Sequence, residues 1–243
     1  MRRWLVNIVL LRVGIDTAEG GFNSPLFADE TFEFVPIPDN KHGVDRRTYG
    51  NTRGRSGRWL VDYFPSRARP RMANVPMHVD PEFETFTYGD PTPPKKSLTR
   101  LESGDLLIFY AGLEGWDFEC APALYMIGYF DVELAGVGSS FSRELLRETF
   151  GRNFHVLHKN IFAGERDEVI LIKGSNRSRL FNKAVKIGAR ARLTSGSWWQ
   201  LILPGMAKVF GRFGGIGSLQ RSTPRWVDTD HIETAARFVR SLP

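Results

Sequence analysis

The sequence has a single cysteine, Cys120, among 243 residues. One cysteine excludes an internal disulfide and any cysteine-rich zinc or iron–sulfur site, and it is typical of a reducing compartment. No run reaches the roughly 18 apolar residues that a membrane helix needs. The apolar run from Trp4 to Leu11 contains Asn7 and ends in Arg12 without a cleavage site, so it predicts a buried strand and not a targeting segment. We therefore expect a cytoplasmic chain without a membrane partner.

The sequence also lacks the common catalytic signatures. It contains no Walker loop, no Rossmann glycine fingerprint, no His-Glu-x-x-His and no nucleophile elbow. The glycines within residues 211–217 follow an aromatic segment and indicate a flexible loop. The sequence therefore identifies neither a reaction nor a metal nor a cofactor, and it leaves open whether the chain is an enzyme.

The composition indicates a folded chain with many turns. Hydrophobic residues make up 42% and charged residues 25%, with 24 Gly, 14 Pro and 18 Phe. This balance excludes disorder and coiled coils for the chain as a whole, and it favours an α+β fold over a helix bundle. We expect a single domain over residues 1–243, with the surface connector at residues 91–97 as its candidate internal boundary.

Hydrophobic patterning predicts a set of strands and two helices. Leu106–Tyr110 and Leu124–Leu134 are expected to form an antiparallel pair joined by a wide loop. Helices are expected over Ser139–Phe150, capped by Ser140, and over Asp230–Leu242, capped by Asp230 with Glu233. Further strands are expected at Trp4–Leu11, Phe32–Ile37, Glu168–Lys173 and Ala184–Leu193, and an apolar segment at Trp198–Leu203 is expected to stop at Pro204. The predicted fold is α+β, with a mixed or barrel-like sheet and flanking helices.

Positive charge is concentrated in two segments. The formal net charge is +6, and residues 41–71 hold nine Lys or Arg against two Asp, while residues 173–192 hold seven and no acid. Clustered Arg favours a surface that faces phosphates; a solvated surface in an Arg-rich protein is the alternative. The candidate nucleic-acid-binding residues are Arg46, Arg47, Arg53, Arg55, Arg177, Arg179 and Lys183.

Polar side chains gather at three places along the chain. Arg12, Asp16 and Ser24 surround the end of the first predicted strand, where sites are commonly built, although a tight turn also explains them. His78 and Asp80 share one side of an extended segment, so they can form a general base, a metal ligand or a hydrogen-bonded strand end. His155 and Lys159 would share a helical face.

The stretch LRVGIDTAEGGFNSPL at residues 11–26, followed by PIPD at residues 36–39, resembles the opening of the nucleotide modification associated domain 3 family. Residues 78–81 are similar to the family's His-Leu-Asp-Pro segment, and later similarities at residues 104–109, 127–129 and 153–160 follow in order. Val13 and Thr17 depart from the Lys and Ser expected there, and Val13 removes a cationic contact. The resemblance implies a cytosolic nucleotide-related protein whose reaction is unassigned.

Residues 104–110 and 127–130 are also similar to a strand pair of the PUA-like and EVE-type barrels, which hold RNA or modified bases in a small pocket. Three functions therefore stay open. The first is an enzyme of nucleotide or nucleic-acid base modification, with His78 as general base oriented by Asp80 and with Asp16 as a second acid or metal carboxylate. The second is a reader that holds a base between aromatics such as Tyr110 and Trp116. The third is a protein-interaction module. For the enzyme, the candidate catalytic residues are Asp16, Ser24, His78, Asp80 and His155, and the candidate substrate-binding residues are Arg12, Asp39, Lys159 and Asn160.

Overall fold

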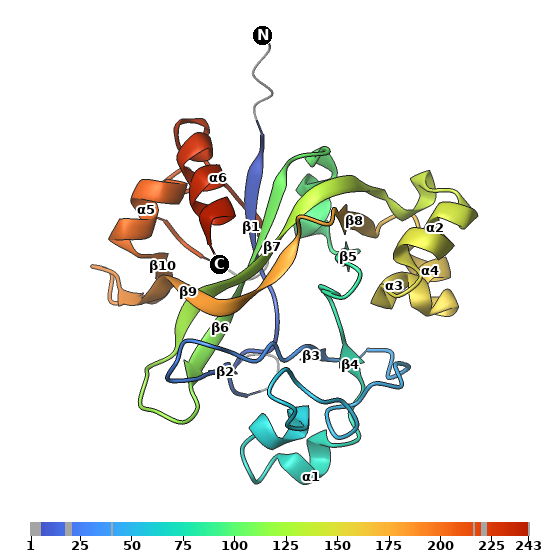
Figure 1. The fold of residues 1–243 in the computed structure, drawn as a ribbon, viewed down its shortest axis with the longest axis horizontal. Helices are drawn as coiled ribbons and strands as arrows, with labels where there is room; N and C mark the ends of the chain where they lie inside the picture. Colours follow the sequence, from blue (N-terminus) through green and yellow to red (C-terminus); the bar gives the residue numbers. More distant parts are fainter. Residues whose placement is uncertain (1–5, 18–20, 40, 216, 220–222, 243) are drawn as a thin grey trace.

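The computed structural model describes residues 6–17, 21–39, 41–215, 217–219 and 223–242. Trp4 and Leu5 of the first predicted strand lie outside the described residues. In the described part of the chain, nine strands form one mixed sheet that is flanked by helices, so the fold is α+β (Figure 1). The strands of this sheet are β1 (Ile8–Arg12), β2 (Ser24–Leu26), β5 (Thr87–Asp90), β6 (Leu106–Gly115), β7 (Ala123–Val137), β8 (Ile170–Gly174), β9 (Arg179–Arg192), β10 (Trp198–Ile202) and β11 (Arg225–Trp226), and a separate pair is β3 (Ile37–Pro38) with β4 (Met77–His78).

Helices cover the sheet at two sides and below it. In Figure 1, α5 and α6 lie at one side, α2 to α4 lie at the other, and α1 lies below with β3 and β4. No helix in the described residues is long and apolar enough to cross a membrane. The α-helices are α1 (Arg69–Met72), α2 (Arg143–Phe150), α3 (Phe154–Leu157), α4 (Lys159–Glu165), α5 (Pro204–Phe210) and α6 (Ile232–Ser241), and the 3₁₀ helices are η1 (Leu60–Tyr63), η2 (Pro93–Arg100), η3 (Gly138–Ser140) and η4 (Thr229–His231).

The β6–β7 hairpin forms the centre of the fold. Its strands are antiparallel, with Leu106 opposite Asp131 and Leu113 opposite Ala123, which confirms the predicted pair. On its other side β6 runs parallel to β1, with Ile8 beside Leu106. Both faces of β1 are covered, which explains why its sequence is a continuous apolar run and not an alternating one.

The sheet is open, so the predicted barrel is wrong. Its main path runs β10-β9-β7-β6-β1-β11, and the outer strands β10 and β11 are not neighbours. The first part of β7 pairs with β9, but its end, from Val132 to Val137, pairs with β8, which in turn pairs with β5. Barrel closure requires the first and last strands to pair at a consistent stagger. Here β7 changes its partner from β9 to β8 along its length, and the sheet divides into two branches.

The two predicted helices are present with different starts. Helix α2 begins at Arg143, because Ser142 and not Ser140 accepts a hydrogen bond from the amide of Leu145 (3.2 Å). Helix α6 begins at Ile232 after the 3₁₀ turn η4, so the N-cap residue is His231 and not Asp230. Strand β10 ends before Pro204 as expected, but Pro204 also begins α5, since a proline suits the first helical turn.

The predicted strand at Phe32–Ile37 is wrong apart from its two ends, because Phe32 forms an isolated bridge with Leu26 and Ile37 belongs to β3. Pro36 and Pro38 lack amide donors for a ladder. The segment instead bonds to several neighbours: the amide of Glu33 donates to the carbonyl of Pro25 (3.0 Å), and the carbonyl of Val35 accepts from Ile15 (2.8 Å). A second apolar core forms beneath it from Ile15, Val35, Tyr49, Tyr63 and Phe64 among others. Met77 of β4 belongs to this core, so the core positions the β3–β4 pair.

Candidate functional site

Two histidines and an aspartate from separate segments meet beside β5. His78 ends β4, Asp80 follows it, and His155 lies in α3. Each offers one ligand atom, and these three atoms lie within 4.8 Å of one another. The side chains of Asp80 and His155 are only 4% and 3% exposed, and Asp80 Oδ2 lies 3.7 Å from His155 Nε2. The structure therefore brings together three of the five predicted catalytic residues in what we call the histidine–aspartate cluster.

Hydrogen bonds hold two residues of the cluster, and all three residues keep an unsatisfied atom. Asp80 Oδ2 accepts a hydrogen bond from the amide of Gly89 (2.8 Å), and His155 Nδ1 shares a hydrogen bond with Glu165 Oε2 (2.7 Å). Among the described residues, His78 Nε2, Asp80 Oδ1 and His155 Nε2 are buried and have no hydrogen-bond partner. Several other buried polar atoms of the described residues also lack a hydrogen-bond partner, but the side chains of His78, Asp80 and His155 converge, which favours a ligand between them.

Burial controls the charge of the cluster. It lowers the pKa of His78 to about 3, with His155 contributing in the same direction, so His78 is a neutral imidazole at neutral pH. Burial also raises the pKa of Asp80 well above its usual value, although the hydrogen bond from Gly89 opposes this. For Glu165, burial acts upward, but the hydrogen bond with His155 and the nearby Lys41 ammonium outweigh it and lower the pKa.

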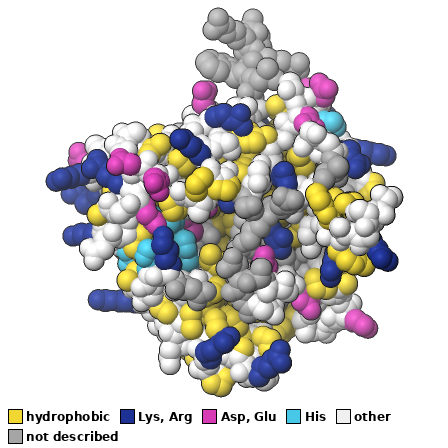
Figure 2. Space-filling model, turned by 180° about the vertical axis from the view of Figure 1, so that it is seen from behind, with side chains coloured by type: hydrophobic (Ala, Val, Ile, Leu, Met, Phe, Trp, Pro, Cys, Tyr) yellow, Lys and Arg dark blue, Asp and Glu magenta, His cyan; other side chains and the backbone are white. Residues whose placement is uncertain are grey.

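Phe154 connects the cluster to further histidines. Its ring is stacked on His78, with centroids 4.0 Å apart, and lies 5.1 Å from the ring of His158 and 6.4 Å from that of His42. Four of the five histidines thus surround one phenylalanine. Figure 2 shows histidine side chains gathered on one part of the rear face, beside acidic and basic side chains. The sequence reasoning missed Phe154, Glu165 and His42, since nothing in their local spacing relates them to His78.

The expected helical face from His155 to Lys159 is wrong. His158 has an extended backbone (φ −97°, ψ 94°) and separates α3 from α4. Its Nε2 lies 3.6 Å from Asp45 Oδ2, which holds it away from the helical path. Lys159 and Asn160 begin α4 and are exposed, so the structure does not bring them into the cluster.

A cavity of about 130 Å³ lies against the cluster. His78, Asp80 and Gly89 form one part of its lining, and Arg12 and Lys95 form another. The cations are balanced, because Arg12 Nη2 lies 3.1 Å from Asp16 and Lys95 Nζ lies 3.7 Å from Asp90. Arg12 therefore lines this cavity, and Asp16 pairs with it without itself lining the cavity. Lys95 was expected in a surface connector, but η2 buries it here.

Two predicted site residues instead accept hydrogen bonds from backbone amides of neighbouring loops. Ser24 is fully buried in β2, and its Oγ accepts a hydrogen bond from the amide of Val35 (3.3 Å). Asp39 accepts hydrogen bonds from the amides of His42 (2.9 Å) and Val44 (3.2 Å), which closes the turn that begins the first basic segment. Neither lines the cavity beside the cluster.

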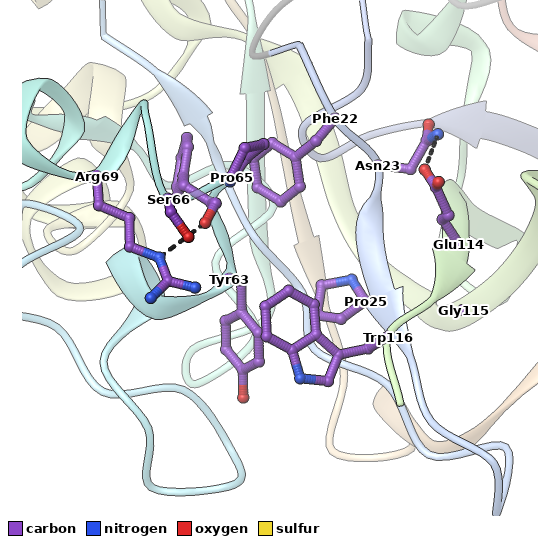
Figure 3. A pocket seen from close by; sticks show the side chains of 11 residues that line it. Phe22, Asn23, Pro25, Tyr63, Pro65, Ser66, Arg69, Glu114, Gly115 and Trp116 are labelled. Atoms are coloured by element: carbon purple, nitrogen blue, oxygen red, sulfur yellow. Dashed lines mark hydrogen bonds between the residues drawn. The ribbon is translucent and has the colours of Figure 1, made fainter. Parts of the chain in front are cut away.

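A larger cavity of about 270 Å³ is aromatic. Figure 3 shows the rings of Tyr63 and Trp116 side by side, with Phe22 across the cavity and the hydrogen-bonded Asn23–Glu114 pair at its edge (3.1 Å). Trp116 is 38% exposed. Tyr110, by contrast, is fully buried in the main core, so the expectation that it holds a base is wrong.

The two basic segments meet at Arg55. Its guanidinium donates to the carbonyl of Phe181 (2.9 Å) and to Asn182 Oδ1 (3.3 Å). On the face drawn in Figure 2, Lys and Arg side chains are spread among acidic ones and do not form one patch. Three others of the seven predicted cations have acidic partners. Arg47 pairs with Asp45 (2.6 Å), Arg177 with Asp131 (2.8 Å) and Lys183 with Glu30 (3.7 Å). Arg53 lies over the ring of Trp59, and Arg179 lies beside that of Tyr129, while Arg46 is exposed.

Comparison with known proteins gives one result. No curated protein and no solved structure matches the chain. The family model for nucleotide modification associated domain 3 matches residues 7–238, which span the sheet, the cluster and both cavities. The chain therefore belongs to the nucleotide modification associated domain 3 family, as the opening motif and the His78–Pro81 segment predicted.

Proposed function

We propose that this chain binds a nucleotide, free or within a nucleic acid, and modifies its base, with the histidine–aspartate cluster as the reacting centre. One observation carries the proposal: three buried, unsatisfied side-chain atoms of His78, Asp80 and His155 face one another beside a polar cavity. A cluster of ionisable groups with shifted pKa values in a concave site is the usual mark of catalysis.

The cavity beside the cluster limits what can enter. Its volume of about 130 Å³ is below the roughly 300–1,000 Å³ of a complete small-molecule site, so it admits one part of a nucleotide. Its lining presents the cations Arg12 and Lys95 together with the carboxylate of Asp90. Such a mixed lining suits the polar edge of a base better than a bare phosphate. His78, being neutral, has a lone pair available to accept a proton or hold a cation.

The aromatic cavity can hold the rest of the substrate. A lining residue of each cavity lies close to Gly112, where a Cβ would lie 2.7 Å from Asn23 Oδ1 and 3.4 Å from Arg12 Nη2. Asn23 lines one cavity and Arg12 lines the other. Stacking on Trp116 and Tyr63 is worth about 1–3 kcal/mol for a base. This aromatic lining also favours the second candidate function, a reader that binds a base without altering it.

Mass spectrometry distinguishes the two. The protein is incubated with nucleotides and with short DNA and RNA strands, and the products are weighed, while binding is measured separately. An enzyme gives a mass change that His155→Ala abolishes, whereas Trp116→Ala weakens binding. The control is His231→Asn, which alters the one histidine outside the group around Phe154 and leaves both properties unchanged. Binding that Trp116→Ala removes, with no mass change under any condition, contradicts catalysis and supports the reader. No binding and no mass change contradict both.

A further inference from the structure

We propose that His78, Asp80 and His155 bind a divalent transition-metal ion through two imidazole nitrogens and one carboxylate oxygen. The three ligand atoms lie within 4.8 Å of one another. A point therefore exists within about 2.8 Å of all three, against roughly 2.0–2.2 Å for zinc bound to nitrogen or oxygen. Side-chain movements below about 1 Å complete the coordination. An ion satisfies at once the three buried atoms that have no hydrogen-bond partner among the described residues.

The cluster is oriented as metal ligands usually are. A ligating histidine commonly gives its other ring N–H to a carboxylate, which fixes the tautomer and aims the free nitrogen. His155 does this: its Nδ1 lies 2.7 Å from Glu165 Oε2, so Nε2 is the free nitrogen facing Asp80. The amide of Gly89 donates to Asp80 Oδ2 and leaves Oδ1 for the ion.

Packing fixes the other parts of the cluster. The ring of His78 is stacked on Phe154 with an interplanar angle of 27°. Strand β5 approaches the cluster at Gly89, where a Cβ would lie 2.8 Å from the His155 ring and 2.9 Å from Asn153 Oδ1. The close approach therefore requires glycine. These contacts hold the ligands near their final positions before an ion arrives, which lowers the cost of binding.

The ligand set indicates the class of ion. Cys120, the only cysteine of the chain, is not among the three ligands, so a thiolate site is excluded here. Three protein ligands leave coordination positions open, as in catalytic zinc sites and in the two-histidine, one-carboxylate sites of non-haem iron. Two of the ligands line the small cavity, from which water or substrate can reach the ion. The reactive role of the ion rests on the proposed function, whereas its binding is independent of it.

Metal content and affinity are measured without substrate. The protein is purified, stripped with a chelator and titrated with Zn²⁺, Co²⁺, Mn²⁺ and, without oxygen, Fe²⁺, and cobalt absorption reports the ligand field. We expect one ion per chain, with a spectrum of nitrogen and oxygen ligation. His78→Ala, Asp80→Asn and His155→Ala should each weaken binding by more than 100-fold, whereas the control His231→Asn should not change it. Saturable binding that these three variants leave intact, or no binding at one ion per chain, overturns the proposal.

Glu165 is tested as a positioning residue. Glu165→Ala should lower affinity by about 10- to 100-fold, and Glu165→Gln, which keeps an oxygen for His155 Nδ1, should restore part of it. Equal affinities for both variants and the unaltered chain overturn the role of Glu165. Since each titration uses folded protein verified by thermal unfolding, loss of affinity is separated from loss of structure. A chain that binds the ion but alters no nucleotide contradicts the proposed function alone, and a nucleotide activity without bound metal contradicts this inference alone.

Discussion

At the scale of single residues, Glu33 is a buried carboxyl group of the second core. It is 2% exposed and packs against Gly54, and Tyr63 contacts it through its hydroxyl. Burial raises its pKa above the ordinary value of 4.5, while amide hydrogen bonds from Arg55 and Ser56 and the charge of Arg55 offset part of this effect. The folded protein thus holds this proton more tightly than the unfolded chain does. Stability contributed by Glu33 is complete below pH 4.5 and decreases as the pH rises through the folded pKa.

We predict that Glu33→Gln stabilises the protein at neutral pH. Glutamine keeps an oxygen for the amide of Ser56 but removes the buried charge, so the free energy of unfolding should rise at pH 7. Near pH 4, where Glu33 is largely protonated, the difference should nearly vanish. Thermal unfolding at both pH values measures it, with the exposed Glu148→Gln as the matched control. A variant that is less stable at pH 7 than the unaltered chain contradicts the assignment.

At the scale of elements, the short helix α3 places His155. Asn153 caps this helix by accepting a hydrogen bond from the amide of His155 (3.1 Å), and the chain breaks at His158 before α4 brings Glu165 back. The sequence could predict His78 with Asp80, because alternate residues of an extended segment share a side. It could not predict Glu165, because a contact across ten residues depends on where two helices break.

We predict that Asn153→Ala weakens metal binding more than its effect on stability explains. Loss of a helix cap costs about 1 kcal/mol, and here it also frees the backbone of His155. Ser142→Ala removes the equivalent cap of α2 and serves as the matched control. Asn153 is fully buried and Ser142 is exposed, so Asn153→Ala should lower the unfolding free energy more than Ser142→Ala, and only Asn153→Ala should lower the affinity for cobalt. Equal cobalt affinities in the two variants would show that α3 does not position the cluster.

The same scale explains which elements the sequence could predict. The β6–β7 hairpin follows from two buried runs that need only each other and one loop. The segment from Phe32 to Ile37 has comparable hydrophobicity, but Pro36 leaves it without a ladder, so tertiary hydrogen bonds determine its path. Lys95 was placed in a surface connector because of the prolines around it. A 3₁₀ helix with buried Leu98 instead carries it to the cavity beside the cluster.

At the scale of the whole molecule, the Lys and Arg residues that cluster in the sequence are less clustered on the folded surface. The two basic segments meet at Arg55, but its guanidinium donates a hydrogen bond to the backbone carbonyl of Phe181. The pairs of Arg47 with Asp45, Arg177 with Asp131 and Lys183 with Glu30 use three more cations of the predicted phosphate-binding set. Counting arginines along the chain therefore overstates how many phosphates a polymer could reach, because Asp131 and Glu30 come from distant segments and their pairing is visible only after folding.

The salt dependence of nucleic-acid binding tests this conclusion. Each neutralised phosphate of a duplex contributes about −0.9 to the slope of log affinity against log salt, so the three cations of the predicted set other than Arg55 and the three in ion pairs, namely Arg46, Arg53 and Arg179, should together contribute about −3. Arg53→Gln and Arg179→Gln should each reduce the slope by about 1, and Lys183→Gln, whose charge is already paired, should leave it unchanged. A slope near −6 would mean that the paired cations, or further cations of the two basic segments, also reach the polymer. A flat response would remove the polymer from consideration and leave a free nucleotide as the ligand, for which the linings of the two cavities offer the cations Arg12, Arg69 and Lys95.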